Sequence, residues 1–255
     1  MKEKEIKDKV QDDNEIILEM KNVKKSFKKN NVLKDVSFKL QKGENLVVLG
    51  RSGTGKSVLI KCIVKLIEID GGSLTVFNED IFDLKEKKLN EIREKIGFLF
   101  QSGALYDSMT VRENLEFPIQ RSSKSVTPAE IEELVKEVLA NVGLEDTIDK
   151  MPSELSGGMR KRISLARTLI LKPELILYDE PTTGLDPITS EEISELILEV
   201  QKKYKTSSII ITHDIKCAKI TSNRIMVIDG GRFIAEGTYE ELKNSNNELV
   251  SSFFK

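Results

Sequence analysis

One eight-residue stretch, Gly50-Arg-Ser-Gly-Thr-Gly-Lys-Ser57, constrains the fold of this chain more than any other. It fits the pattern G-x-x-x-x-G-K-[ST] at every fixed position. The apolar run over residues 46–49 precedes it and is typical of a buried strand, and apolar residues follow with helical spacing over residues 58–67. A strand, a glycine loop and a helix in this order predict a phosphate-binding turn in an α/β fold.

The residue types in this loop suit a nucleotide triphosphate. Small residues let backbone N–H groups close around phosphate oxygens, and the helix N-terminus adds partial positive charge. Lys56 is expected to reach the β- and γ-phosphates, and the Ser57 hydroxyl is expected to ligate Mg²⁺. The flanking strand and helix disfavour a glycine-rich turn that matches by chance. The candidate nucleotide-binding residues here are Gly50, Arg51, Ser52, Gly53, Thr54, Gly55, Lys56, Ser57 and Val58.

Composition excludes several other classes of protein. The 255 residues carry 40 Lys+Arg against 42 Asp+Glu, so the net charge of −2 gives no reason to expect a nucleic-acid partner. The two cysteines, Cys62 and Cys217, lie in apolar or helical contexts and are expected to be reduced thiols. No apolar run approaches the ~18–20 residues of a membrane span and no secretory signal is visible, so we expect any membrane role to need a partner.

The order of apolar runs predicts a parallel sheet covered on both faces, with a helical insertion. A charged tail over residues 1–15 precedes the main domain at 16–238, and a C-terminal extension follows at 239–255. Asp229-Gly230-Gly231 is interpreted as a hairpin turn between two short strands. Strands are predicted at 16–20, 36–40, 73–76, 96–100, 175–178, 208–212, 224–228 and 233–236, and helices at 111–119, 128–142 and 158–171, within the insertion at 103–171, and at 188–204.

Two acids follow the apolar strand at residues 175–178. Asp179 is expected to hold Mg²⁺, directly or through water, and Glu180 to orient or deprotonate the attacking water. A strand end capped by surface acids is the simpler interpretation of the pair alone. Together with the phosphate loop, the functional interpretation is favoured, because open α/β sheets bind ligands at the carboxyl ends of their strands.

A second anion-binding helix terminus is predicted at Leu155-Ser-Gly-Gly-Met159. Ser156 is a candidate N-cap, and Gly157 and Gly158 leave backbone N–H groups uncovered. One loop already binds one triphosphate, so the second anion-binding site needs a phosphate from elsewhere. A homodimer is the simplest arrangement that supplies it, with each chain closing on the nucleotide of its partner. Here the chain resembles the ATP-binding-cassette (ABC) ATPases, whose Leu-Ser-Gly-Gly-Gln signature is matched except at Met159.

The resemblance covers residues 16–238 and implies a P-loop NTPase core with a parallel sheet, an antiparallel β subdomain and an inserted helical subdomain. It also implies ATP and Mg²⁺ as ligands. Phe27 matches the aromatic that stacks on adenine, and Gln101 matches the glutamine that contacts Mg²⁺ and the attacking water. Asp186 matches the loop that crosses the dimer interface, and His213, the only histidine, matches the residue that contacts the γ-phosphate.

Longer stretches are similar to the ATPase of the Mla-type phospholipid transporters. They are residues 51–62, 100–118 and 154–163, the last including Met159. The similarity implies a dimer on the cytoplasmic face of the inner membrane, with integral membrane permease subunits and an MCE-domain lipid-binding protein. The segment 101–118 is expected to dock on the permease, although its apolar residues also suit a helical core. In this family a C-terminal tail reaches the neighbouring subunit, and residues 250–254 are candidates for it.

The expected mechanism is a cycle in which two ATP·Mg²⁺ close the dimer and hydrolysis opens it. The γ-phosphate would bridge Lys56 and His213 of one chain to Ser156 and Gly158 of the other. Three alternatives remain: an ABC transporter ATPase with another cargo, a soluble ABC protein acting on DNA or the ribosome, and a regulatory subunit without turnover. The basic run at residues 160–162 is interpreted as a helix face rather than a nucleic-acid contact.

Overall fold

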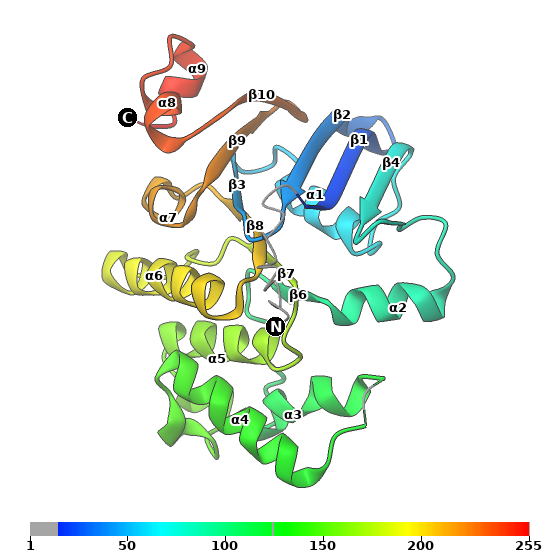
Figure 1. The fold of residues 1–255 in the computed structure, drawn as a ribbon. Helices are drawn as coiled ribbons and strands as arrows, with labels where there is room; N and C mark the ends of the chain where they lie inside the picture. The colour runs from blue at the N-terminus through cyan, green and yellow to red at the C-terminus, as the bar shows by residue number, and fades with distance from the viewer. Residues whose placement is uncertain (1–14, 124, 255) are drawn as a thin grey trace, which may run out of the picture.

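The computed structural model describes residues 15–123 and 125–254, which form two sheets and a helical layer (Figure 1). The predicted charged tail lies outside the described residues except for Glu15. The larger sheet has the order β10-β9-β3-β8-β7-β6 and is parallel except for the β9–β10 hairpin. Its strands are β3 (Asn45–Leu49), β6 (Ile96–Leu99), β7 (Leu175–Asp179), β8 (Ser207–Thr212), β9 (Arg224–Asp229) and β10 (Arg232–Gly237).

The central strands of this sheet are buried on both faces, as predicted. In β3, Val47 and Leu49 pack into one hydrophobic cluster, and Leu46 and Val48 pack into another on the opposite face. Strand side chains alternate between faces, so an uninterrupted apolar run is required when both faces are covered. The predicted turn at Asp229-Gly230-Gly231 is confirmed, since β9 and β10 pair antiparallel around it.

The second sheet is antiparallel, with the order β2-β1-β4-β5, and packs over one face of the first. Its strands are β1 (Ile16–Phe27), β2 (Asn30–Gln41), β4 (Gly71–Val76) and β5 (Glu79–Asp80). The first two strands run twelve residues each, well beyond the predicted 16–20 and 36–40. Outside the predicted ranges, each strand buries only one apolar residue, Val23 in β1 and Leu33 in β2, so these parts show no hydrophobic alternation and are held in the sheet by main-chain pairing. The strand-loop-helix unit is completed by α1 (Lys56–Ile63).

Helices cover the other face of the large sheet (Figure 1). Between β6 and β7 the chain forms α3 (Val111–Arg121), α4 (Pro128–Val142), the 3₁₀ turns η1 (Glu145–Thr147) and η2 (Pro152–Glu154), and α5 (Gly157–Leu169). Capping boxes at Thr110 and Thr127 fix the starts of α3 and α4. Further along lie α6 (Pro187–Tyr204) and α7 (Ile215–Thr221).

Four helices escaped prediction, because stretches of four to nine residues are too short to show a clear helical period. They are α2 (Glu86–Glu94), α7 (Ile215–Thr221), α8 (Tyr239–Lys243) and α9 (Glu248–Ser251). Over the described part of the chain, none of the helices has the length and apolar character needed to span a bilayer. Cys62 and Cys217 are free and buried, and burial raises the pKa of each thiol to about 11.

Candidate active site

Four predicted residues or loops meet at one edge of the large sheet. The glycine loop follows β3, His213 follows β8, Asp179 ends β7, and Gln101 lies two residues beyond β6. The strands β3, β8, β7 and β6 are adjacent and parallel, so their carboxyl ends share one edge. Segments far apart in sequence therefore form one site, at the position where open α/β sheets bind ligands.

The glycine loop needs glycine at specific positions. Gly55 has a φ of +101°, and a Cβ there would approach the Val32 carbonyl oxygen to 3.0 Å. A Cβ on Gly50 would come within 2.6 Å of the Ile228 carbonyl oxygen. Backbone conformation at one glycine and close packing at both therefore exclude side chains, which leaves the amide groups open toward the cavity.

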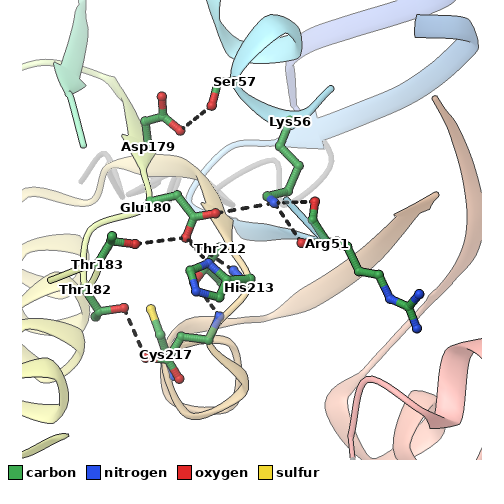
Figure 2. A network of polar contacts seen from close by, with 12 residues as sticks. Arg51, Lys56, Ser57, Asp179, Glu180, Thr182, Thr183, Thr212, His213 and Cys217 are labelled. Carbon is green, nitrogen blue, oxygen red and sulfur yellow. Dashed lines mark hydrogen bonds and ion pairs between the residues drawn. The ribbon is translucent and has the colours of Figure 1, made fainter. Parts of the chain in front are cut away.

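Lys56 lies at the floor of this site and is held by its own loop (Figure 2). Its Nζ donates to the carbonyl oxygens of Gly50 at 2.7 Å and Arg51 at 3.0 Å. The same Nζ lies 3.4 Å from Glu180 Oε1, and the side chain is buried. An ammonium held by exchangeable contacts beside an amide-lined loop is suited to receive a phosphate oxygen.

Ser57 and Asp179 form a candidate cation site. The Ser57 hydroxyl donates to Asp179 Oδ1 at 2.9 Å, and the Asp179 side chain is buried. Burial raises the pKa of this carboxyl group, because a carboxylate loses solvation there. A hydroxyl and a carboxylate beside a phosphate loop are the oxygen donors that Mg²⁺ prefers. Among the described residues, no three acid, histidine or cysteine side chains form a metal cluster.

Glu180 connects Lys56 to His213 (Figure 2). Its Oε2 lies 2.8 Å from His213 Nδ1 and accepts from the Thr183 hydroxyl at 3.4 Å. Its backbone has a φ of +51°, which is uncommon for a glutamate, and its N–H donates to the Ile211 carbonyl at 2.9 Å. Such backbone conformations cost energy and concentrate at functional sites. The strained turn aims a buried carboxylate at the cavity, where it can accept a proton from water.

These residues surround a cavity of about 710 Å³. The predicted aromatic Phe27 is 45% exposed and forms part of its wall, as do Gln101 and Val58. Thr54 binds the loop instead, donating to the Arg51 carbonyl at 2.9 Å. The lining residues are Phe27, Val32, Gly50, Arg51, Ser52, Gly53, Gly55, Lys56, Ser57, Val58, Gln101, Glu180, His213, Ser252 and Phe253.

The predicted signature residues lie outside this cavity. Ser156 caps α5 by accepting from the Met159 N–H at 3.2 Å, and Ser156 and Gly157 are exposed. Asp186 caps α6, accepting from the Ile188 N–H at 3.1 Å and the Thr189 N–H at 3.0 Å. Within one chain, the structure therefore does not bring Ser156, Gly157, Gly158 or Asp186 to the glycine loop.

Sequence reasoning interpreted residues 160–162 as a helix face and missed the role of Lys161. Lys161 is only 7% exposed, and its Nζ donates to the carbonyl oxygen of Gln101. Burial lowers the pKa of this lysine, and the nearby carboxylates of Asp179 and Glu180 oppose that shift. Its spacing from Leu165 and Leu169, four and eight residues on, placed it on the buried stripe of α5 and could have revealed it.

Comparisons with known proteins agree with this geometry. The family model described as ABC transporter matches residues 33–183. A probable ribonucleotide transport ATP-binding protein of Mycobacterium leprae is 37% identical over 238 residues, 93% of this chain and 68% of that protein. The chain thus spans about two thirds of the length of such mycobacterial relatives.

Two further matches are a plant relative and a solved structure. The Arabidopsis thaliana protein TRIGALACTOSYLDIACYLGLYCEROL 3, chloroplastic, is 38% identical over 261 residues, 96% of this chain and 75% of that protein. A dimeric ATP-binding cassette, solved in a post-hydrolysis state with ADP and Pi, matches with a TM-score of 0.80 at 32% identity. That match covers 87% of this chain and 98% of the other. The predicted P-loop ABC ATPase fold is confirmed.

Proposed function

The chain belongs to the ABC transporter family, and we propose that its ATPase activity drives the movement of phospholipid between two membranes. The Arabidopsis relative carries this proposal, because it aligns with 96% of this chain and its name is that of a glycerolipid. The resemblance of residues 51–62, 100–118 and 154–163 to the Mla-type ATPases points to the same cargo class. Maintenance of outer-membrane lipid asymmetry is the process we infer for it.

The site supports a hydrolytic mechanism in which each polar residue has one task. Lys56 would exchange its bonds to loop carbonyls for the β- and γ-phosphate oxygens of ATP. Glu180 would take a proton from the attacking water, and His213, 2.8 Å from it, would contact the γ-phosphate. Ser57, Asp179 and Gln101 would hold Mg²⁺, which neutralises charge on the phosphates.

The second half of each site would come from a second copy of the chain. Cassettes of this family dimerise. Ser156 and Gly157 are exposed and away from the cavity of their own chain, so their helix terminus is free to meet a partner's γ-phosphate. Ile188 lies near Asp186 at the start of α6 and is 74% exposed. An apolar side chain with this exposure supports an interface at that end of α6. ATP would thus close the homodimer, and hydrolysis would open it.

A permease contact is proposed at Tyr106, which precedes α3, and at Phe117, which lies on α3. Tyr106 is 44% exposed, and its ring lies 4.9 Å from that of Phe117. Leu105, by contrast, packs against the core, so the docking proposal rests on Tyr106 and Phe117 and not on Leu105. The aromatic pair would seat a cytoplasmic helix of an integral membrane permease at the inner membrane. An MCE-domain lipid-binding protein would complete the complex.

The proposal can be tested by purifying the tagged chain with its complex from detergent-solubilised native membranes. We expect a permease and an MCE-domain protein to co-purify, with phospholipid detected by mass spectrometry of the complex. We also expect phospholipid in reconstituted proteoliposomes, and not added ribonucleotides, to stimulate ATP hydrolysis. Recovery of a sugar- or amino-acid-type permease, or stimulation by ribonucleotides alone, would overturn the cargo.

A pair of variants separates permease docking from catalysis. Tyr106→Ala should lose most of the co-purified permease while the isolated chain keeps its ATP affinity. Leu66→Ala removes a similarly exposed apolar side chain just beyond α1 and serves as the matched control. Equal permease recovery with Tyr106→Ala and Leu66→Ala would refute the proposed docking surface and would leave the ATPase assignment unchanged.

A further inference from the structure

The C-terminal segment is held firmly against the body of its own chain. Val250 is completely buried in the cluster on the helical face of the sheet. Asn247 caps α9 by accepting from the Leu249 N–H at 3.0 Å and the Val250 N–H at 3.3 Å. The Phe254 ring packs edge-on against Tyr239 of α8, with the centroids 5.4 Å apart. A buried anchor, a cap and an aromatic contact therefore fix where the intervening residues lie.

This anchoring brings Ser252 and Phe253 into the wall of the cavity beside the glycine loop. The Phe253 ring lies 5.8 Å from the guanidinium carbon of Arg51, the second residue of that loop. Figure 2 shows the Arg51 side chain extending away from Lys56 toward the C-terminal ribbon. A cation over an aromatic face is attractive, so the loop and the segment position each other. The extension thus contacts the nucleotide site of its own chain.

Two aromatic side chains from opposite ends of the sequence therefore line one cavity. Phe27 comes from the end of β1 and Phe253 from the residues after α9. Lys56 and the loop amides supply charge for phosphates at the floor of the same cavity. The remaining part of a nucleotide is a planar base, and aromatic rings bind bases by stacking.

We propose that Phe253 contacts the nucleobase of ATP and, with Phe27, forms the base-binding part of the site. Arg51 would hold the Phe253 ring in place and so link the base to the phosphate loop. The C-terminal segment is then a working part of the nucleotide site in its own chain. This inference needs only the ATPase site and does not depend on the cargo.

The full-length Phe253→Ala variant tests the proposal with two ligands, ATP and inorganic tripolyphosphate, which lacks a base. Losing one stacked ring should raise the Kd for ATP by about tenfold, since base stacking on one aromatic is typically worth that much. The Kd for tripolyphosphate should stay the same. Leu249→Ala, an exposed apolar residue on α9, is the matched control and should leave both constants unchanged.

Phe253→Trp gives an independent measurement, because the chain contains no tryptophan of its own. The new indole should be quenched when ATP is added and unaffected by tripolyphosphate. Tighter ATP binding by Phe253→Ala would overturn the proposal, because the ring would then be a cover that ATP must displace. Equal weakening for both ligands, or no ATP-dependent quenching in Phe253→Trp, would overturn it as well.

Discussion

Replacing Glu180 with glutamine should separate ATP binding from ATP hydrolysis. Glutamine has the size and shape of glutamate, but its amide cannot take a proton from water. General bases contribute roughly 10²–10⁴-fold to rate, so we expect turnover to fall by about that factor. This corresponds to about 2.7–5.4 kcal/mol of activation free energy.

The contacts around Glu180 explain why binding should survive the change. The Glu180–His213 contact at 2.8 Å can be kept, since an amide oxygen at the position of Oε2 can still accept from the imidazole and from the His213 backbone N–H. The glutamate also lies 3.4 Å from Lys56 Nζ. Removing its negative charge frees the ammonium for phosphate oxygens. The Kd for ATP should therefore be unchanged or lower, and a closed dimer should accumulate.

Three measurements on the Glu180→Gln variant check this reasoning. Phosphate release under single-turnover conditions gives the rate, equilibrium binding of a fluorescent ATP analogue gives the affinity, and light scattering during size-exclusion chromatography gives the mass. Glu199→Gln is the matched control, because Glu199 is an exposed acid on the same chain's α6. A rate within tenfold of the unaltered chain would refute the role of Glu180 as base. ATP binding weakened as much as turnover would instead show that the variant damages the site.

Two further substitutions test residues around the cation site. Lys161→Met removes the donor to the Gln101 carbonyl. The kcat should therefore fall about tenfold while the KM for ATP changes little. A selective rise in KM would refute a positioning role for Lys161. Asp179→Asn removes a buried carboxylate whose pKa is raised, so the Mg²⁺-free Tm at pH 8 should rise by about 2–4 °C while turnover is lost. The folded state binds the Asp179 proton more tightly than the unfolded state, so this penalty is fully present above the folded pKa and is relieved as pH falls toward the unfolded value of about 3.9. Scanning calorimetry over a series of decreasing pH values should show the gain in Tm shrinking, and a gain that stays constant or grows would contradict this reasoning.

The central sheet could be predicted because its strands are buried on both faces. Residues 175–178 and 209–211 are unbroken apolar runs, and the strands β7 and β8 observed there are each one residue longer than predicted. The outer elements were predicted incompletely, because they are not buried on both faces. Beyond Met20, β1 buries only Val23, and α2 buries only Leu89 and Ile92. Main-chain pairing and capping define such elements, and neither produces a periodic apolar pattern.

The residues of the candidate site were likewise predicted only in part. Lys56, Ser57, Asp179 and Glu180 follow strands or form a local motif, so sequence order alone predicted that they meet. Lys161 and Phe253 reach the site only through tertiary packing. For Lys161 the helical period gave a usable signal, since it shares a stripe with Leu165. For Phe253 no local signal existed, because its place depends on the burial of Val250 and on the path of the chain beyond β10.

The charges of the site give a physical reason for the proposed dimer. Within one chain, the positive charges of Arg51 and Lys56 equal in number the carboxylates of Asp179 and Glu180, and the buried Lys161 near these carboxylates adds one positive charge. ATP with Mg²⁺ adds two net negative charges, and the N-terminus of α1 contributes only about half a positive charge. The chain's other glycine-rich helix terminus, at Ser156, cannot help its own nucleotide, because it lies outside the cavity. A second copy would bring that terminus to the uncompensated γ-phosphate, so loss of this phosphate on hydrolysis would remove the charge that holds the two chains together.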